Sequence, residues 1–359
     1  MTHSNSSFRN NLYKWYQIHK RDLPWRNTSD PYAIWVSEVM LQQTRVDTVI
    51  DYYHRFLSRF PTVADLASAT QESVLKIWEG LGYYARARNL HKAAQWLMKN
   101  MNGALPDTWE AFRALPGVGD YIAHAVLSIA YHQPYAVVDG NVKRVYARFY
   151  QLSEPVNQSQ SHEVYQKAAN RALFTSHPAD WNQAIMELGA LICTPTSPKC
   201  TLCPVSGECK SFLHHQVQKY PKRVDIAKVP THHISIGVVH KNDKLLITRR
   251  KEEGLLGGLW EFPGGKQMKK ETPQKACVRE IYEECHLNVA VESHLARVKH
   301  AYTHFKVDID VFVCKYVLGR VRLTSATAHK WVRSSELSKY PFPKANHLFM
   351  KKLLEYFAD

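Results

Sequence analysis

The sequence predicts two domains of different fold class: a mostly α-helical domain over residues 1–211 and an α+β domain over residues 232–359. Apolar residues recur at helical spacing through the first part of the chain. From residue 232 the pattern becomes strand-like, with strands expected over 232–240 and 244–250 and a turn at Asn242-Asp243. The segment between the domains, FLHHQVQKYPKRVDIAKVPT at 212–231, is basic and contains prolines, so we expect a linker.

The composition favours a nucleic-acid partner. The chain carries a formal net charge of +15, with 47 lysines and arginines against 32 acidic residues, although a basic protein of another kind would show the same balance. No apolar run approaches the roughly 18 residues that a membrane span needs, and the N-terminal MTHSNSSFRNN lacks the apolar core of a signal peptide. We therefore expect a cytoplasmic, nucleoid-associated protein without membrane contact, whose seven cysteines are reduced or metal-bound.

A glycine-containing turn, Leu115–Gly119, precedes a predicted helix over Tyr121–Tyr131. Gly117 and Gly119 allow a sharp turn with exposed N–H groups, and the following helix adds the positive end of its dipole. The pattern is typical of a helix-hairpin-helix that docks a phosphate, although a plain helix–helix turn could have the same residues. An apolar stretch then leads to a single acid, Asp139.

A second acid, Glu38, stands in an otherwise apolar helix. Residues 8–24 are predicted as the first helix of the chain, and the Glu38 helix follows, with Asp30 as its cap and Pro31 in its first position. Two interpretations of Glu38 fit: it points to water from a polar face, or it is partly buried with a raised pKa. The second would make Glu38 a candidate for acid–base chemistry.

Four cysteines follow a helix predicted over Trp181–Ile192, with the spacing C-x6-C-x2-C-x5-C: Cys193, Cys200, Cys203 and Cys209. Four thiolates in one compact loop suit a metal centre, either a four-cysteine zinc site or an iron–sulfur cluster.

A third motif, in the second domain, resembles the Nudix box, G-x5-E-x7-R-E-U-x-E-E-x-G-U, in which U is aliphatic. Its positions are Gly265, Glu271, Arg279, Glu280, Glu283 and Glu284, and His286 replaces the last glycine. A helix capped by Thr272 would place three of these glutamates on one face, where they could hold Mg²⁺. The box is either an inactive remnant or a nucleotide pyrophosphatase site. We expect the remnant, because His286 would carry a steric penalty at a left-handed helix end.

Motifs along nearly the whole chain resemble the adenine DNA glycosylases of the MutY type, in the helix-hairpin-helix superfamily of endonuclease III. They are RDLPWR (21–26), EVMLQQT (38–44), GLGYYARARNL (80–90), LPGVG (115–119) and VVDGNV (137–142). The resemblance implies a glycosylase domain with a cluster loop, a Nudix-like C-terminal domain, and a [4Fe–4S] cluster rather than zinc on the four cysteines.

The resemblance also implies roles for individual residues. Glu38 would be the catalytic acid and Asp139 would stabilise the sugar cation, with Tyr121 and Asn141 lining the pocket. DNA contacts are implied for Gln42, Gln43, Thr44, Leu81, Tyr83, Gly117, Val118, Gly119 and Lys199. The family's Phe-Ser-His loop, which reads 8-oxoguanine, corresponds to Tyr302, Thr303 and His304, so two of its three residues differ here. Asp120, beside the hairpin, is assigned no role.

Together these features predict a monomeric base-excision enzyme that removes adenine mispaired with 8-oxoguanine or guanine in double-stranded DNA. Tyr121 stands where endonuclease III has its Schiff-base lysine, so we expect a monofunctional enzyme that leaves an abasic site. Three alternatives are an endonuclease III-like glycosylase–lyase, a stand-alone Nudix pyrophosphatase and a silent lesion-binding module. The absent lysine, the N-terminal domain and the presence of both acids, respectively, argue against them.

Overall fold

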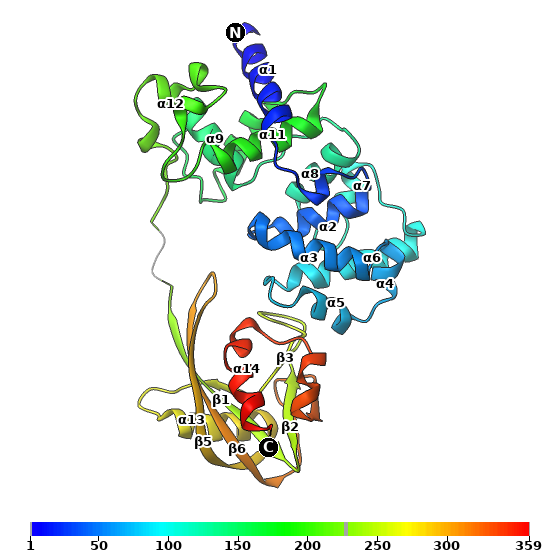
Figure 1. Cartoon of the computed structure of the whole chain (residues 1–359), viewed down its shortest axis with the longest axis vertical. Helices are drawn as coiled ribbons and strands as arrows, with labels where there is room; N and C mark the ends of the chain where they lie inside the picture. The colour runs from blue at the N-terminus through cyan, green and yellow to red at the C-terminus, as the bar shows by residue number, and fades with distance from the viewer. Residues whose placement is uncertain (1, 226–228, 359) are drawn as a thin grey trace. The chain divides into compact units, whose positions relative to one another are not determined.

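The computed structural model of the protein describes residues 2–225 and 229–358, which form two compact units (Figure 1). Unit 1 consists of Met1–Ala67 and Lys92–Ile226, and unit 2 of Ser68–His91 and Ala227–Asp359. Unit 2 therefore combines the C-terminal chain with a segment from the first third of the sequence. The predicted fold class, helices followed by an α+β arrangement, is confirmed.

Unit 1 is built from helices. In chain order they are α1 (Thr2–His19), α2 (Pro31–Leu41), α3 (Val46–Arg59), α4 (Val63–Ser68), the later turns of α6 (Ala85–Met101), α7 (Trp109–Arg113), α8 (Asp120–Ala130), α9 (Gly140–Tyr150), α10 (His162–Ala172), α11 (Pro178–Leu191) and α12 (Lys210–Leu213). Short 3-10 turns join them at η1 (Pro24–Arg26), η2 (Cys200–Leu202), η3 (Ser206–Glu208) and η4 (Val217–Lys219). Among the described helices, none has the length and apolar character that crossing a membrane requires.

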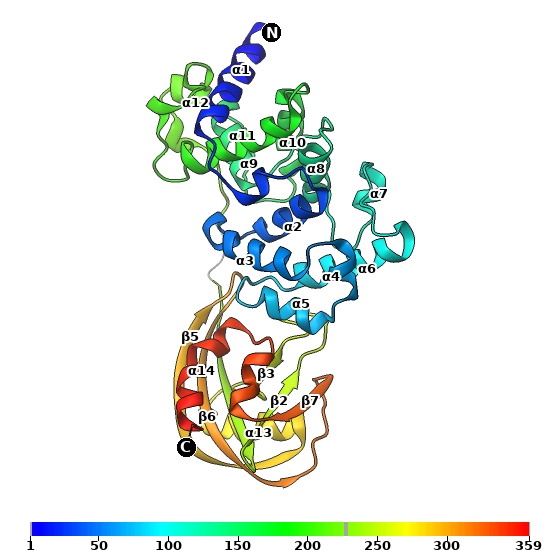
Figure 2. The same ribbon diagram turned by 45° about the vertical axis from the view of Figure 1, so that its right-hand side comes forward.

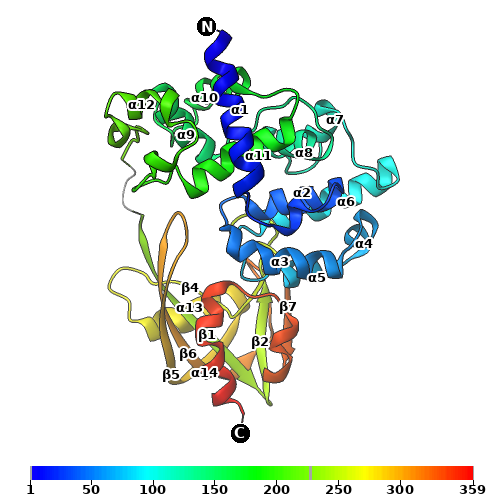
Figure 3. The same cartoon turned by 45° about the horizontal axis from the view of Figure 1, so that its top comes forward.

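The core of unit 1 forms where helices distant in sequence meet. Helix α1 lies along α11, as Figure 3 shows, and its Phe8 contacts both Phe149 of α9 and Trp181 of α11. Helix α9 also packs directly on α11, and α2 packs on α8. Burial of these aromatic side chains stabilises the packing of α1, α9 and α11.

Local sequence explains where the helices begin and end. Asp30 accepts a hydrogen bond from the Tyr32 N–H at 3.0 Å and Pro31 is the first residue of α2, as predicted. The predicted first helix, 8–24, was wrong at both ends, since α1 spans Thr2–His19. Its C-terminal end comes early because the backbone and guanidinium of Arg21 are both bound to Glu187, which draws the chain out of the helix.

Part of the predicted linker is fixed to unit 1. Helix α12 and η4 lie in or next to residues 212–225, and hydrogen bonds join Val156 to Lys222 and Arg148 to Tyr220. Residues 226–228, also in the predicted linker, lie outside the described residues. The proposed domain boundaries at 211 and 232 stay a prediction.

Unit 2 holds one mixed sheet with strand order β3-β2-β1-β6-β5, in which β4 also pairs with β1 and β7 with β2. Strands β1 and β6 are parallel and the other pairs are antiparallel. The strands are β1 (Thr231–Lys241), β2 (Lys244–Arg249), β3 (Trp260–Glu261), β4 (Gly264–Lys266), β5 (Leu287–Ala301), β6 (Lys306–Gly319) and β7 (Ala328–Val332). The predicted hairpin is confirmed: Asn242 and Asp243 have φ angles of 47° and 57°, as a tight two-residue turn requires.

Helices cover both faces of this sheet, α13 (Pro273–Cys285) on one and α14 (Lys344–Tyr356) on the other (Figure 2). Alternate residues of the central strands point to opposite faces. Val238 and Val311 belong to the core under α14, and their neighbours Val239 and Phe312 belong to the core under α13. The helix α5 (Gln71–Trp78) and the start of α6 complete unit 2.

Candidate functional site

Glu38, Asp139, Tyr121 and Asn141, far apart in sequence, line one pocket of unit 1. We call it the Glu38 pocket. Its other lining residues come mainly from the RDLPWR segment and from helices α2, α8 and α11: Arg21, Leu23, Trp25, Arg26, Ile34, Ser37, Leu41, Thr44, Val46, Ile129, Gln183, Met186, Glu187 and Ala190. The structure thus brings together all four side chains that the sequence assigned to catalysis.

Glu38 is buried, with 4% of its surface exposed, because α2 is enclosed on every side. The interpretation that it points to water is therefore wrong. Burial raises the pKa of Glu38 to about 7, a hydrogen bond from Tyr121 opposes that rise, and the nearby Asp139 adds to it. The Tyr121 hydroxyl donates to Glu38 Oε2 at 3.0 Å, and its own pKa is raised well above the ordinary value by burial and the two acids. Tyr121 therefore stays a donor.

Asp139 is held in a different environment, at the N-terminus of α9. Its Oδ1 accepts the Val142 N–H at 2.7 Å and its Oδ2 accepts Asn141 Nδ2 at 2.8 Å. Burial raises the pKa of Asp139, while these donors and the Arg144 charge lower it and so limit the rise. Asp139 accepts two N–H donors and lies at the positive end of a helix, whereas Glu38 accepts a single hydroxyl. The negative charge is therefore better stabilised on Asp139, so when the pair holds one proton, that proton lies on Glu38.

Arg144 was missed by the sequence analysis and ties Asn141 to the cysteine loop. It donates to Asn141 Oδ1 at 2.9 Å, to the Gly189 carbonyl at 2.6 Å and to the Cys193 carbonyl at 2.7 Å. Gly189 allows the approach of α9 to α11, since a Cβ there would lie 2.7 Å from Asn141 Cβ. The spacing of Arg144, three residues after Asn141 on one helix, is the signal that could have revealed it.

Glu187 was also missed, and it explains the RDLPWR motif. It is 1% exposed and accepts hydrogen bonds from the guanidinium groups of Arg21 at 2.7 Å and Arg26 at 2.9 Å. Burial alone would raise the pKa of Glu187, but these arginines lower it to about 2. Glu187 is therefore a fixed anion in the same pocket as the protonatable Glu38, and Arg26 lowers the pKa of both.

The predicted helix-hairpin-helix is present as α7, a turn and α8. Gly117 has a φ of 75°, and Gly119 is the N-cap of α8 with no side-chain cap, so the first N–H groups of α8 are open to an anion. Val118 is buried and anchors the turn. Asp120, to which the sequence assigned no role, accepts a hydrogen bond from Arg113 Nε at 2.7 Å. Arg113 also donates to the Val118 carbonyl, so these two contacts stabilise the hairpin.

The other residues expected at DNA from unit 1 lie near the ends of helices. Gln42 ends α2, and Gln43 follows with a φ of 55°, which leaves its side chain exposed. Thr44 Oγ1 donates to the Gln42 carbonyl at 3.3 Å. Lys199 is exposed beside the cysteine loop. Their contacts with DNA stay predictions.

A second pocket lies within unit 2. We call it the Tyr83 pocket; it is lined by residues 80–86, 254–256 and 300–305 and by Lys344. Leu81 is buried in its wall and Tyr83 is 37% exposed, with a φ of 48°. The Tyr83 hydroxyl is hydrogen bonded to Thr303 Oγ1. The structure thus places Leu81 and Tyr83 beside Tyr302, Thr303 and His304, which the sequence assigned to DNA from separate domains.

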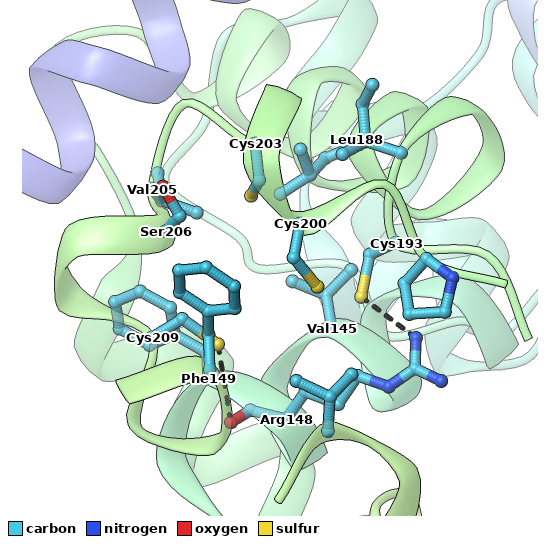
Figure 4. Close-up of a pocket in the computed structure, with 14 residues that line it drawn as sticks. Val145, Arg148, Phe149, Leu188, Cys193, Cys200, Cys203, Val205, Ser206 and Cys209 are labelled. Carbon is cyan, nitrogen blue, oxygen red and sulfur yellow. Dashed lines mark hydrogen bonds between the residues drawn. The ribbon is translucent and has the colours of Figure 1, made fainter. Parts of the chain in front are cut away.

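The four cysteines line one largely apolar cavity, between the loop 193–209 and helix α9 (Figure 4). In the described part of the chain, no three histidine, cysteine or carboxylate side chains are grouped to hold a single metal ion. A zinc ion needs its thiolates converged at Zn–S distances of about 2.3 Å, whereas a cluster binds each cysteine to a different iron. Arg148 Nη1 donates to Cys193 Sγ at 3.3 Å.

The Nudix box forms the predicted helix α13, capped by Thr272, but its carboxylates are engaged by other groups. Arg279 pairs with Glu271 at 2.8 Å and with Glu280 and Glu283 at 2.9 Å. Glu284 accepts the Gly264 N–H at 3.1 Å and Ser325 Oγ at 3.0 Å. His286 ends the helix with a φ of 56°, the left-handed conformation that the family's glycine suits.

We expect His286→Gly to stabilise unit 2 by about 1 kcal/mol, because glycine removes the penalty of a side chain in this conformation. Chemical denaturation followed by tryptophan fluorescence would measure this change in the free energy of unfolding.

The wild-type protein, incubated with 8-oxo-dGTP and Mg²⁺, should release no pyrophosphate above background. Turnover that is lost in Glu283→Gln would contradict this and reveal a second active site.

The hairpin, the buried acid pair and the cysteine loop define a helix-hairpin-helix DNA glycosylase. The model of the "HhH-GPD superfamily base excision DNA repair protein" family matches residues 36–171, and the NUDIX domain model matches 235–352. The structure of a thermostable thymine-DNA glycosylase, 28% identical, superposes with a TM-score of 0.54 over 59% of this chain and 97% of that one. Endonuclease III in a DNA complex, 23% identical, shares the fold with a TM-score of 0.50 over 60% of this chain and 97% of its own.

Sequence relatives place the chain more narrowly. The adenine DNA glycosylase of Mus musculus is 37% identical, over 99% of this chain and 78% of that protein. The corresponding protein of Rattus norvegicus is 36% identical over the same shares. The chain belongs to the adenine DNA glycosylase family.

Proposed function

We propose that the enzyme hydrolyses the N-glycosidic bond of adenine mispaired with 8-oxoguanine or guanine in duplex DNA and works as a monomer. The observation that carries the proposal is the pairing of Glu38 and Asp139 in one buried pocket, with pKa values set by different surroundings. Two carboxyl groups held in this way suit the cleavage of a bond to a sugar through a cationic transition state.

Each side chain has a distinct task in this reaction. Adenine leaves poorly as an anion and lies inside the base stack, so it must be flipped out and protonated. Glu38, with a pKa near 7, donates its proton to a ring nitrogen as the bond from the sugar C1′ to the base breaks. Tyr121 holds Glu38 Oε2, which leaves Oε1 for the proton. Asp139 stabilises the positive sugar. Water then adds to C1′ and loses a proton, which returns the Glu38 carboxylate to its acid form.

The test of this function is adenine release from duplexes that differ in one base. We expect release from adenine opposite 8-oxoguanine and opposite guanine, and none from adenine opposite thymine. The Tyr83 pocket supports the preference for 8-oxoguanine, since Thr303 and His304 offer a hydroxyl and an imidazole for hydrogen bonding. Equal rates on all three duplexes would exclude mismatch repair, and release of a pyrimidine instead would exclude adenine as the substrate.

We expect strand scission to require alkali or heat after base release. Tyr121 cannot form an imine, and no lysine lines the Glu38 pocket within the described residues. Borohydride added during turnover should therefore trap little covalent DNA adduct, whereas Tyr121→Lys should trap more. A substantial adduct with the wild type at neutral pH would instead support the glycosylase–lyase alternative.

We propose that Cys193, Cys200, Cys203 and Cys209 hold a [4Fe–4S] cluster, which would staple the loop that carries Lys199. Burial raises the pKa of Cys200, Cys203 and Cys209, that of Cys203 to about 12, so metal binding would have to drive the ionisation of these three thiols. Cys200→Ser should lose visible absorbance and weaken DNA binding, while Cys277→Ala, a cysteine in the core of unit 2, should keep the absorbance. Zinc in anaerobically purified wild type would contradict the cluster.

A further inference from the structure

Helix α5 is bound to the C-terminal chain through its polar side chains. Glu72 Oε2 accepts the indole N–H of Trp260 at 2.8 Å, and Lys76 donates to the Tyr340 carbonyl at 3.1 Å. Gly258 approaches the same helix so closely that a Cβ there would lie 3.1 Å from a methyl group of Leu75. These contacts join residues nearly two hundred or more positions apart in the sequence, all within unit 2.

Glu79, the residue after α5, is the centre of these contacts. Its Oε1 accepts the Phe342 N–H at 2.6 Å and His347 Nε2 at 3.1 Å, and its Oε2 accepts Lys76 Nζ. Burial raises the pKa of Glu79, but the three donors outweigh burial and hold it below its ordinary value. The carboxylate is therefore charged and has donors from both α5 and the segment at the start of α14.

The chain on each side of this contact leads directly into the Tyr83 pocket. Gly80 follows Glu79 and is the first residue of one wall, residues 80–86. Lys344, two residues after Phe342, lines another part of the same pocket. The first wall is a rigid turn, because Trp78 Nε1 and Arg86 Nη2 both donate to the Gly82 carbonyl. The turn 80–86 meets the loop 300–305 at Tyr83 and Thr303, and Glu79 joins the start of the same turn to Phe342.

We propose that Glu79 is a positioning residue for mismatch reading: it fixes the turn 80–86 against the segment 342–344 and so sets the separation of the walls that recognise the base opposite adenine. This inference rests on the proposed function, because it takes the Tyr83 pocket to be the reading site. Glu79 itself does not line the Tyr83 pocket. Glu79 acts through the hydrogen bond between Tyr83 and Thr303, which requires the turn 80–86 and the loop 300–305 to stay in contact.

The charge makes this contact sensitive to substitution. A buried carboxylate with several N–H donors is worth more than a neutral acceptor, and removing it leaves those donors unsatisfied. Glu79→Gln keeps one oxygen for the Phe342 N–H but loses the negative charge and the acceptor for Lys76, whereas Glu79→Ala removes every contact. A comparison of Glu79→Gln with Glu79→Ala therefore separates the loss of the negative charge from the loss of the whole contact. Glu292 provides a matched control, since it forms a similar pair with His240 at 2.7 Å and does not line the pocket.

The experiment measures single-turnover adenine release by the full chain on two duplexes, identical except for 8-oxoguanine or guanine opposite adenine. The readout is the ratio of the two rates. In Glu79→Ala we expect the ratio to fall by about tenfold, with the guanine duplex slowed much less than the 8-oxoguanine duplex. Glu79→Gln should recover most of the ratio, and Glu292→Ala should leave it unchanged. Thermal denaturation of each variant checks that it is folded.

Each contrary outcome has a separate meaning. A normal ratio in a folded Glu79→Ala variant would overturn the inference and leave the proposed function intact. Equal slowing on both duplexes would also overturn it, because Glu79 would then only support the fold or DNA binding. A wild-type ratio of one would overturn the reading function of the pocket and this inference with it. If Glu79→Ala does not fold, His347→Ala, which removes one donor to the same carboxylate, decides: its ratio should fall, and a normal ratio would overturn the inference.

Discussion

Replacing Glu38 with glutamine is expected to slow single-turnover adenine release by roughly 10²–10⁴-fold, the contribution of a general acid. Glutamine keeps the size of the side chain and can still accept the Tyr121 hydroxyl, but it has no carboxyl proton to give. Affinity for a duplex with adenine opposite 8-oxoguanine should stay within a few-fold of wild type, because Glu38 lies buried in α2. Glu163→Gln, the same change on the exposed surface of α10, should alter neither quantity.

The pH dependence gives an independent check of the same role. The active form of Glu38 is protonated, and its pKa in the folded protein is about 7. The wild-type rate should therefore be highest below this pH and fall as pH rises through it. The residual rate of Glu38→Gln should lack this fall. Folding stability has the same pH dependence. Because folding raises the pKa of Glu38, this group contributes a stabilising free energy that is fully present below the unfolded-state pKa of 4.5 and is lost as pH rises through about 7. A wild-type rate that increases through neutral pH would contradict the assignment.

Replacing Asp139 with asparagine should slow adenine release by at least roughly 10²–10³-fold, the effect of removing one preorganised electrostatic group at a transition state. The substitution preserves the fold, since asparagine is as good an N-cap as aspartate and keeps an oxygen for the Val142 N–H. What it loses is the negative charge that faces the sugar. Single-turnover kinetics with saturating enzyme would isolate this step.

Asp30→Asn is the matched control, because Asp30 caps α2 through the Tyr32 N–H in the same manner. It should leave the rate within about twofold, as the cap is retained. A rate for Asp139→Asn within a few-fold of wild type would show that Asp139 only caps α9. A large loss of thermal stability in Asp139→Asn, without one in Asp30→Asn, would assign the effect to folding.

Short-range patterns allowed much of the fold and part of the site to be predicted. Asp30-Pro31, Thr272-Pro273 and Asn242-Asp243 determine local geometry, so the starts of α2 and α13 and the β1–β2 turn could be inferred directly. The left-handed His286 followed from one departure in a motif. Glu38 was ambiguous, because its helix has apolar residues all round, and only tertiary packing decides whether such a helix exposes or buries its one acid.

The supporting contacts could not be predicted, because they join residues that sequence spacing does not relate. Glu187 is separated from Arg21 by 166 positions, and Glu79 from Phe342 by 263. In the sequence each resembles an ordinary surface residue, Glu187 within α11 and Glu79 directly after α5, and its charge gains a role only when the fold supplies a partner. The pairing of residues 68–91 with the C-terminal chain is of the same kind. Composition alone gives no sign of such a pairing.

The discontinuous make-up of unit 2 has a consequence during synthesis on the ribosome. Residues 68–91 are made long before the strands they pack against, and the whole of Lys92–Ile226 intervenes. At bacterial to eukaryotic elongation speeds this delay is roughly ten to thirty seconds. Through that interval Leu75 and Glu72 have no Gly258 or Trp260 to meet. The packing of α5 on these residues can therefore form only after the intervening segment and the first strands of unit 2 have been synthesised.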